Sequence, residues 1–312
     1  MLVQARVQFK RPKTLELKQQ GFSLVDMHIH SNYSDGINRV SSIVKKAQKK
    51  GFGIAMTDHN EIRGCLEALQ HKDCYIIPGI ETNSDEGIHT LFYFYSPRDL
   101  EEFYNSAVHN YKRKNPNTFL KTNLAELLEK ARNYSCVISA AHPFSVAWTG
   151  MFKSAHKNYV TEETIQHIDA LEVITGSNLH RANKKAIEFA DKIKKGITGG
   201  SDGHTLNEMG RVVTYTFDNL EPNEFLDAIT DNSTYVMGKE TQIFHRAATH
   251  SVKINAPMKD PMTSLTKGID YMKKRDYKLK HIIEPIVQEI SAELNHRKEQ
   301  IKKFFMKRKP GQ

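Results

Sequence analysis

The chain has 312 residues, of which 39% are hydrophobic and 26% are charged, as is ordinary for a soluble protein. Its first residues lack the apolar run of a signal peptide, and no stretch approaches the roughly 18 apolar residues of a membrane helix. Three scattered cysteines are too few for a disulfide framework. These features exclude a disulfide-stapled or membrane-spanning chain, and we expect a cytoplasmic protein.

The net charge of +9 is distributed unevenly. Residues 245–312 contain 16 Lys and Arg against seven Asp and Glu, whereas the rest of the chain contains 29 of each kind. The chemistry of the neutral part and the contacts of the basic part are therefore separate questions. We expect three regions: an N-terminal arm over residues 1–22, a body over 23–240 and a basic, mostly helical extension over 241–312.

The first distinctive stretch is DMHIH at residues 26–30, which follows two apolar residues and predicts a buried strand. Side chains alternate along a strand, so Asp26, His28 and His30 should share one face. Two adjacent core imidazoles would both need partners for their ring nitrogens, whereas neutral imidazole is the commonest protein ligand of metals. A chance pair of core histidines is the alternative that this stretch leaves open.

Strands and helices then alternate about seven times along the body. Strands are expected over residues 53–57, 75–80, 89–95, 136–141, 170–174, 197–200 and 212–217, and helices over 41–50, 62–70, 120–132, 181–195 and 221–230. Such alternation favours parallel strands with right-handed crossovers. The sequence therefore predicts an α/β fold.

Polar side chains collect where these strands end, which is where α/β barrels place their active sites. His89 instead begins its strand, after a sharp turn that could return it to the same rim. These residues and Asp35, which belongs to a neighbouring Asp-Gly sequence, give nine candidate ligands. They are His28, His30, Asp35, His59, Glu81, His89, His142, Asp202 and His204.

Nine such groups on one rim would be costly to bury without cations. Mixed nitrogen and oxygen ligands without cysteine suit two or three Zn²⁺, Mn²⁺ or Fe²⁺ ions and argue against a structural zinc site. Glu81 has two oxygens and could bridge two ions. Asp35 could instead only form a turn, and His89 could be a satisfied edge histidine.

The series HIH with SDG, then TDH, PGIE, GIHTLFYF, AHPF and TGGSDGH resembles the PHP family, named for its polymerase and histidinol-phosphatase members. The match covers about residues 23–230. The resemblance implies a distorted (β/α)7 barrel with a trinuclear metal site that hydrolyses phosphoesters, and it makes all nine candidates metal ligands. LEVITGSN at 171–178 resembles another family segment, with Thr175 where Asn is usual, and we expect it to be structural or to support the ligands.

Two departures from the family pattern bear on the substrate. Histidinol-phosphatase members tend to have histidine where Asp35 stands, so the chain is more similar to the branch that acts on small nucleotides. Many relatives have arginine where Ser145 stands, so Arg181 or Arg211 could bind the substrate phosphate instead. For each of these arginines, a solvated surface side chain is the alternative.

We therefore expect a metal-dependent phosphoesterase that uses a metal-bridging hydroxide on a phosphomonoester or phosphodiester of a nucleotide or short oligonucleotide. His204 or Asp202 could relay a proton to the leaving oxygen. A histidinol-phosphatase-like enzyme and an amidohydrolase-like C–N hydrolase are alternatives, although the latter often uses a carboxylated lysine where Glu81 stands. A non-catalytic metal-binding module would be expected to lack ligands, and none is missing.

The basic extension lies beyond these motifs. Apolar residues recur at helical spacing from 282 to 294, which predicts an amphipathic helix that packs on its own protein or in a homodimer. Residues 302–309 mix aromatic and basic side chains. They could contact an anionic membrane surface or a nucleic acid, or form a solvated end.

Overall fold

The structure is a computed structural model that describes residues 6–145, 149–152, 156 and 158–240, all within one compact unit. The basic extension and its amphipathic helix lie outside the described residues. In the described part, one mixed sheet has the strand order β1-β10-β9-β2-β3-β4-β5-β6-β7-β8. The strands are β1 (Val7–Gln8), β2 (Ser23–Ile29), β3 (Gly53–Met56), β4 (Ile76–Asn83), β5 (His89–Phe94), β6 (Cys136–Ala140), β7 (Ala170–Thr175), β8 (Gly196–Gly200), β9 (Val212–Thr216) and β10 (Tyr235–Gly238).

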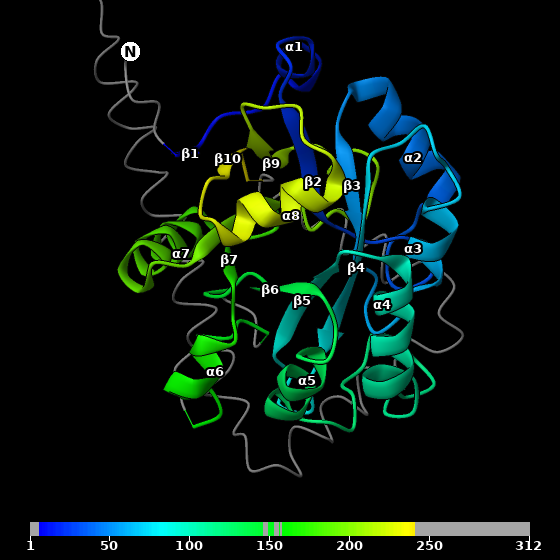
Figure 1. Cartoon of the computed structure of the whole chain (residues 1–312), viewed down its shortest axis with the longest axis vertical. Coiled ribbons are helices and arrows are strands. Elements are labelled where there is room, and N and C mark those ends of the chain that lie inside the picture. The colour runs from blue at the N-terminus through cyan, green and yellow to red at the C-terminus, as the bar shows by residue number, and fades with distance from the viewer. Residues whose placement is uncertain (1–5, 146–148, 153–155, 157, 241–312) are drawn as a thin grey trace, which may run out of the picture. The chain divides into compact units, whose positions relative to one another are not determined.

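Helices cover the outside of this sheet. They are α1 (Thr14–Gln19), α2 (Val40–Lys50), α3 (Arg63–Ala68), α4 (Pro97–Phe103), the π-helix η1 (Tyr104–His109), α5 (Leu124–Ala131), α6 (Glu162–Gln166), α7 (His180–Ile193) and α8 (Pro222–Thr230). Figure 1 shows α2, α3 and α4 along one side of the curled sheet, with α6 and α7 on the opposite side. The helix expected over residues 41–50 is present as α2, which buries Ile43, Val44 and Ala47 and ends at Gly51 with φ 72°.

The sheet curls until its distant strands meet. Ile29, at the end of β2, forms a parallel bridge with Gly203, which follows β8, and the His30 N–H donates to the Gly203 carbonyl at 3.0 Å. Side chains from six strands, among them Val25, Met27 and Tyr93, also form one buried cluster, to which α8 adds Phe225. Such a cluster requires a curled sheet, so the expected distorted α/β barrel is confirmed.

The expectation of parallel strands is right only in part. β2-β3-β4 and β6-β7-β8 pair in parallel, but β5 runs antiparallel to β4 and β6, and β9 runs antiparallel to β2 and β10. For β5 the cause lies in residues 84–88, where the Gly87 N–H donates to the Ser84 carbonyl at 2.8 Å in a tight turn after β4. So short a connection can only join antiparallel strands.

The hairpin formed by β4 and β5 positions His89 for the site. It places His89 opposite Asn83 in the ladder, at the end of β4 that carries Glu81. The predicted return of His89 to the common rim is thereby confirmed. Within the described residues, every helix is too short or too polar to span a bilayer.

Candidate metal centre

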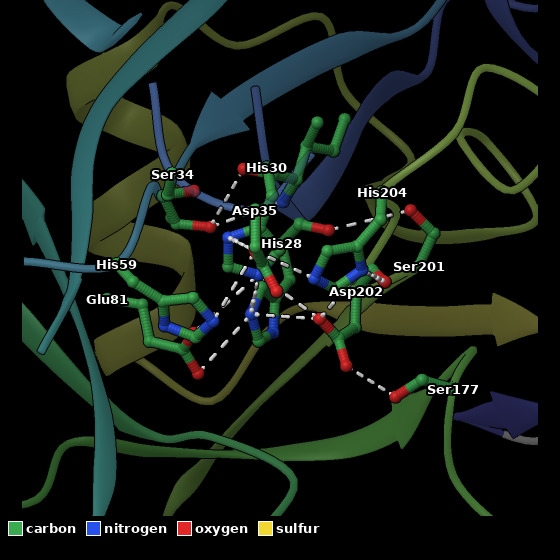
Figure 2. A network of polar contacts seen from close by, with 12 residues as sticks. His28, His30, Ser34, Asp35, His59, Glu81, Ser177, Ser201, Asp202 and His204 are labelled. Atoms are coloured by element: carbon green, nitrogen blue, oxygen red, sulfur yellow. Dashed lines mark hydrogen bonds and ion pairs between the residues drawn. The ribbon is translucent and has the colours of Figure 1, made fainter. Parts of the chain in front are cut away.

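All nine predicted ligands converge at this rim of the barrel. Figure 2 shows His28, His30 and Asp202 directed toward one another, with Asp35, His59 and His204 around them. The Nε2 atoms of His28 and His30 are 3.1 Å apart, and Nε2 of His30 is 3.1 Å from Oδ1 of Asp202. His204 Nε2 lies 3.0 Å from Oδ1 of Asp35. The side chains therefore form one polar cluster rather than separate surface groups.

Glu81 lies at the centre of the cluster and is fully buried. Its Oε1 is 3.0 Å from His89 Nδ1, 3.3 Å from His142 Nε2 and 3.4 Å from His28 Nε2, and its Oε2 is 2.8 Å from His59 Nδ1 and 3.6 Å from His30 Nε2. One carboxylate thus faces five imidazoles. This position agrees with the bridging role expected for Glu81.

Three overlapping groups of ligand atoms are close enough to hold ions. They are His30, Asp35, His59 and His204; His28, His30 and Asp202; and His59, Glu81 and His89. A neutral imidazole has a single nitrogen lone pair, so His30 and His59 can each serve only one of their two groups at a time. His142 joins the cluster through its contact with Glu81.

Glu172 on β7 orients two of the histidines. Its Oε1 lies 3.0 Å from His28 Nδ1, and its Oε2 accepts from the His142 backbone N–H at 2.8 Å. With Nδ1 of His28 held by this carboxylate, Nε2 is left facing the cluster, as is usual for metal-binding histidines. The neighbouring Ser177 Oγ donates to Oδ2 of Asp202. The segment that was expected to support the ligands is thus in contact with them.

Two buried aspartates, Asp26 and Asp58, have roles that the sequence reasoning missed. Asp26 accepts from the backbone N–H groups of Ser201 and Gly210, both at 2.8 Å, and burial raises its pKa to about 6. Asp58 accepts from the Ser31 N–H at 2.7 Å and from Ser34 Oγ at 2.6 Å.

These aspartates fasten the loops that carry Asp202, His204 and Asp35. Each hydrogen bond to an ionised carboxylate contributes about 1.5–3 kcal/mol. The available signal was their position, since Asp26 shares a strand face with His28, and Asp58 directly precedes His59 after a buried strand.

Three non-glycine residues at the rim adopt left-handed backbone conformations. They are Asn60 (φ 47°), His142 (φ 28°) and Asp202 (φ 48°). Such conformations are unfavourable for residues with a side chain, and they persist where the surroundings fix them. At this rim they direct ligand side chains to one point.

Burial lowers the pKa of a histidine, whereas neighbouring carboxylates raise it, and the balance differs among the clustered histidines. Burial alone would lower the pKa of His59, but Glu81 and Asp35 raise it to about 9. Burial lowers the pKa of His30 to about 3, with a further contribution from His204 and His59. Burial likewise lowers the pKa of His89 to about 4. His30 and His89 are thus neutral at pH 7 and have a lone pair to offer.

The buried donor atoms fit a divalent cation. Within the described residues, Nδ1 of His30, Nδ1 of His59, Nε2 of His204 and Oε2 of Glu81 make no hydrogen bond. They nevertheless lie close together, as in the 2.8 Å approach of His59 to Glu81. Buried polar atoms are rarely left without hydrogen bonds. A set of nitrogen and oxygen donors that face one another without hydrogen bonds is what a bound metal ion requires.

The two arginines predicted to bind substrate lie apart from these contacts. Arg181 is exposed on α7. Arg211 donates from Nε to the Asn207 carbonyl at 2.9 Å, within its own loop. Their role in substrate binding stays a prediction.

Comparison with known proteins decides the family. The model of the PHP domain matches residues 26–204, and the model of the PHP-associated region matches residues 180–234. The chain belongs to the PHP family. Membership of this family, with the ligand-rich cluster, indicates a metal-dependent hydrolase.

Several known proteins are similar to this chain in sequence or in fold. An uncharacterised protein of Methanocaldococcus jannaschii is 27% identical over 218 residues, which cover 66% of this chain and 78% of the relative. A two-domain protein of Bacteroides vulgatus, described as containing a predicted PHP-like metal-dependent phosphoesterase, is 17% identical with a TM-score of 0.51, over 76% of this chain and 70% of that one. The lesion-specific endonuclease Q of Pyrococcus furiosus is 22% identical with a TM-score of 0.53, over 69% and 57%.

Proposed function

We propose that this PHP protein is a metal-dependent phosphoesterase that hydrolyses a phosphomonoester or phosphodiester of a nucleotide or short oligonucleotide. The observation that carries the proposal is the central carboxylate of Glu81, buried among five imidazoles with Asp35 and Asp202 beside them. A metal-free role for so many converging buried polar groups would be costly.

The cluster is open on one side. The side chains of His28, His30 and Glu81 are fully buried, whereas those of Asp35 and Asp202 are 24% and 14% exposed. A substrate can therefore reach the cluster from the side of the two aspartates. The scissile phosphoester would meet the clustered side chains there, whereas Glu172 and His28 stay away from solvent.

The donors suit two or three Zn²⁺, Mn²⁺ or Fe²⁺ ions, held by the nine clustered side chains. Such ions, when bound, neutralise phosphate charge and lower the pKa of water so that hydroxide is available near neutral pH. The protein's own residues fix the approach of the ester and exclude bulk water from the buried side.

His204 is the better candidate to move a proton at the leaving oxygen. Its Nδ1 lies 2.9 Å from the Asp202 carbonyl, which can only accept, so this nitrogen carries the hydrogen. Nε2 then remains for the open side, where it could bind a cation or exchange a proton, but not both at once. For Asp202, burial would raise the pKa, but His28 and His30 hold it well below its usual range. An acid so readily ionised is a poor proton donor.

The proposed nucleotide substrate also rests on a fold likeness. Endonuclease Q, which has been solved in complex with a duplex that carries an abasic lesion, has a TM-score of 0.53 to this chain at 21% identity. The chain spans 57% of that protein. A small-molecule phosphatase similar to histidinol phosphatase is the second candidate, and Asp35 in place of histidine argues against it.

A substrate panel tests the proposed function. The metal-loaded full chain should hydrolyse mononucleotides, 3′,5′-bisphosphates or short oligonucleotides, and a chelator should abolish this turnover. Phosphate release and product masses provide the measurement, with histidinol phosphate, an amide and a lactone in parallel. Turnover of the amide or lactone with no phosphoester hydrolysed would contradict the proposal.

A further inference from the structure

A positively charged loop lies next to the metal centre. Residues 103–125 contain four basic residues, Lys112, Arg113, Lys114 and Lys121, and no Asp or Glu. We refer to residues 112–121, between η1 and α5, as the basic loop. Lys114 and Lys121 are both exposed. A charge run of this kind is often only a solvated surface, so its attachment to the protein is what matters.

The basic loop is attached through Asn60, the residue after the ligand His59. The Asn60 side chain is fully buried, and its Nδ2 donates to the carbonyls of Pro116 at 2.7 Å and Thr118 at 2.9 Å. The Asn60 backbone N–H donates to the Glu81 carbonyl at 2.8 Å. One residue thus joins the basic loop to the segments that carry two of the central ligands.

Arg63 joins the basic loop through a carboxylate that it shares with Lys112. Lys112 Nζ and Arg63 Nη2 both donate to Oε2 of Glu61, at 3.2 Å and 2.9 Å. Glu67, which accepts from the Tyr33 hydroxyl at 2.9 Å, adds a second carboxylate near Arg63. The net positive charge of this surface therefore comes from Arg113, Lys114 and Lys121 of the basic loop. The Arg63 side chain is 64% exposed, and its guanidinium lies 5.1 Å from the ring centroid of Tyr33, two residues before Asp35.

We propose that the basic loop and Arg63 bind a backbone phosphate of single-stranded nucleic acid, next to the phosphoester that lies at the metal centre. Tyr33 holds Arg63 in place, since the guanidinium lies over its ring, which also packs against the hydrophobic core. Exposed lysine and arginine side chains that follow the backbone are the electrostatic element of a single-strand binding site. This inference rests on the proposed phosphoesterase function, because the metal centre defines which phosphate reacts.

The cations would add a second phosphate site beside the metal centre. A nucleotide with one phosphate can occupy only the metal centre, whereas an oligonucleotide also presents a second phosphate within reach of the basic loop. The attachment at Asn60 fixes this second site relative to His59 before substrate arrives. Positioning of this kind reduces the entropy that is lost on binding. The site would thus favour oligonucleotides over mononucleotides.

Binding to metal-stripped full-length protein tests the inference apart from catalysis. Anisotropy of a fluorescein-labelled single-stranded hexanucleotide is measured across a salt series for wild type, for Lys114→Gln with Lys121→Gln, and for Arg63→Gln. Each lost phosphate contact should lower the slope of log affinity against log salt by about 0.7. Because the two lysines are proposed to share one backbone phosphate, the double variant should lose about 0.7 in slope and bind roughly fivefold more weakly at low salt.

The matched control removes two exposed lysines at the opposite end of the barrel, Lys49→Gln with Lys72→Gln, which precede β3 and β4. This variant should keep most of the wild-type slope. Equal slopes in all four proteins would overturn the inference, and so would equal losses in the control. The binding assay measures no turnover. A failed substrate panel would therefore refute the proposed function without changing the outcome of the binding test.

Discussion

At the scale of single residues, the site depends on carboxylates that hold imidazoles in a fixed orientation. Glu172 is the clearest example, since its two oxygens contact His28 Nδ1 and the His142 N–H. Neither contact can be read from the sequence, because β7 lies far along the chain from both histidines. What the sequence does provide is the acidic residue on a buried strand, which must have a partner.

Glu172→Gln tests this orienting role. The amide has the same shape, but it carries no charge and presents an NH₂ group to one of its two partners. Removing such a partner of a metal-binding histidine typically lowers metal affinity by about 10- to 100-fold. We expect a loss of this size in a zinc titration against a competing chelator.

The matched control is Glu129→Gln, an exposed glutamate on α5 that should leave the affinity unchanged. Wild-type affinity in Glu172→Gln, with normal circular dichroism, would show that Glu172 does not orient the ligands.

At the scale of elements, the metal centre requires β2 and β8 to approach closely. A Cβ on Gly200 of β8 would lie 2.4 Å from the His28 Cβ and 2.5 Å from the His28 backbone nitrogen. Real Cβ atoms do not approach so closely, so only glycine fits where these strands meet. The glycine is thus a requirement of the site as well as of the sheet.

Gly200→Ala should displace His28 and separate β2 from β8. We expect weaker metal binding by at least about tenfold, together with a lower melting temperature, because overpacking a core typically costs about 1–3 kcal/mol. Calorimetry and metal titration measure the two effects. A variant that binds metal as tightly as wild type would show that the approach of these strands does not position His28.

The elements also show where sequence reasoning succeeds and where it fails. Short apolar runs that end in His, Asp or Glu predicted both the strands and the ligands, because each pattern lies within a few residues. The antiparallel β5 was missed, although the turn at residues 84–88 leaves no room for a crossover. β10 was not predicted, since a strand of four residues gives little periodic signal.

At the scale of the whole molecule, basic residues gather within the barrel as well as in the extension. Positive charge was expected to act from Arg181 or Arg211 and from the extension over residues 241–312, which lies outside the described residues. Within the described barrel, the basic loop and Arg63 lie beside the metal ligands instead. The contact of Asn60 with residues 116 and 118 spans more than 50 residues and has no local signature.

The central claim is that nine side chains from distant segments bind several metal ions around Glu81. Its most direct test is the metal content of purified protein after loading and desalting, measured by inductively coupled plasma mass spectrometry. Wild type should retain two or three divalent ions per chain. Glu81→Gln should lose at least one of them while keeping its circular dichroism, because the shared carboxylate would no longer carry charge. Wild-type protein that is folded but retains no metal, or Glu81→Gln with the full wild-type content, would contradict the account.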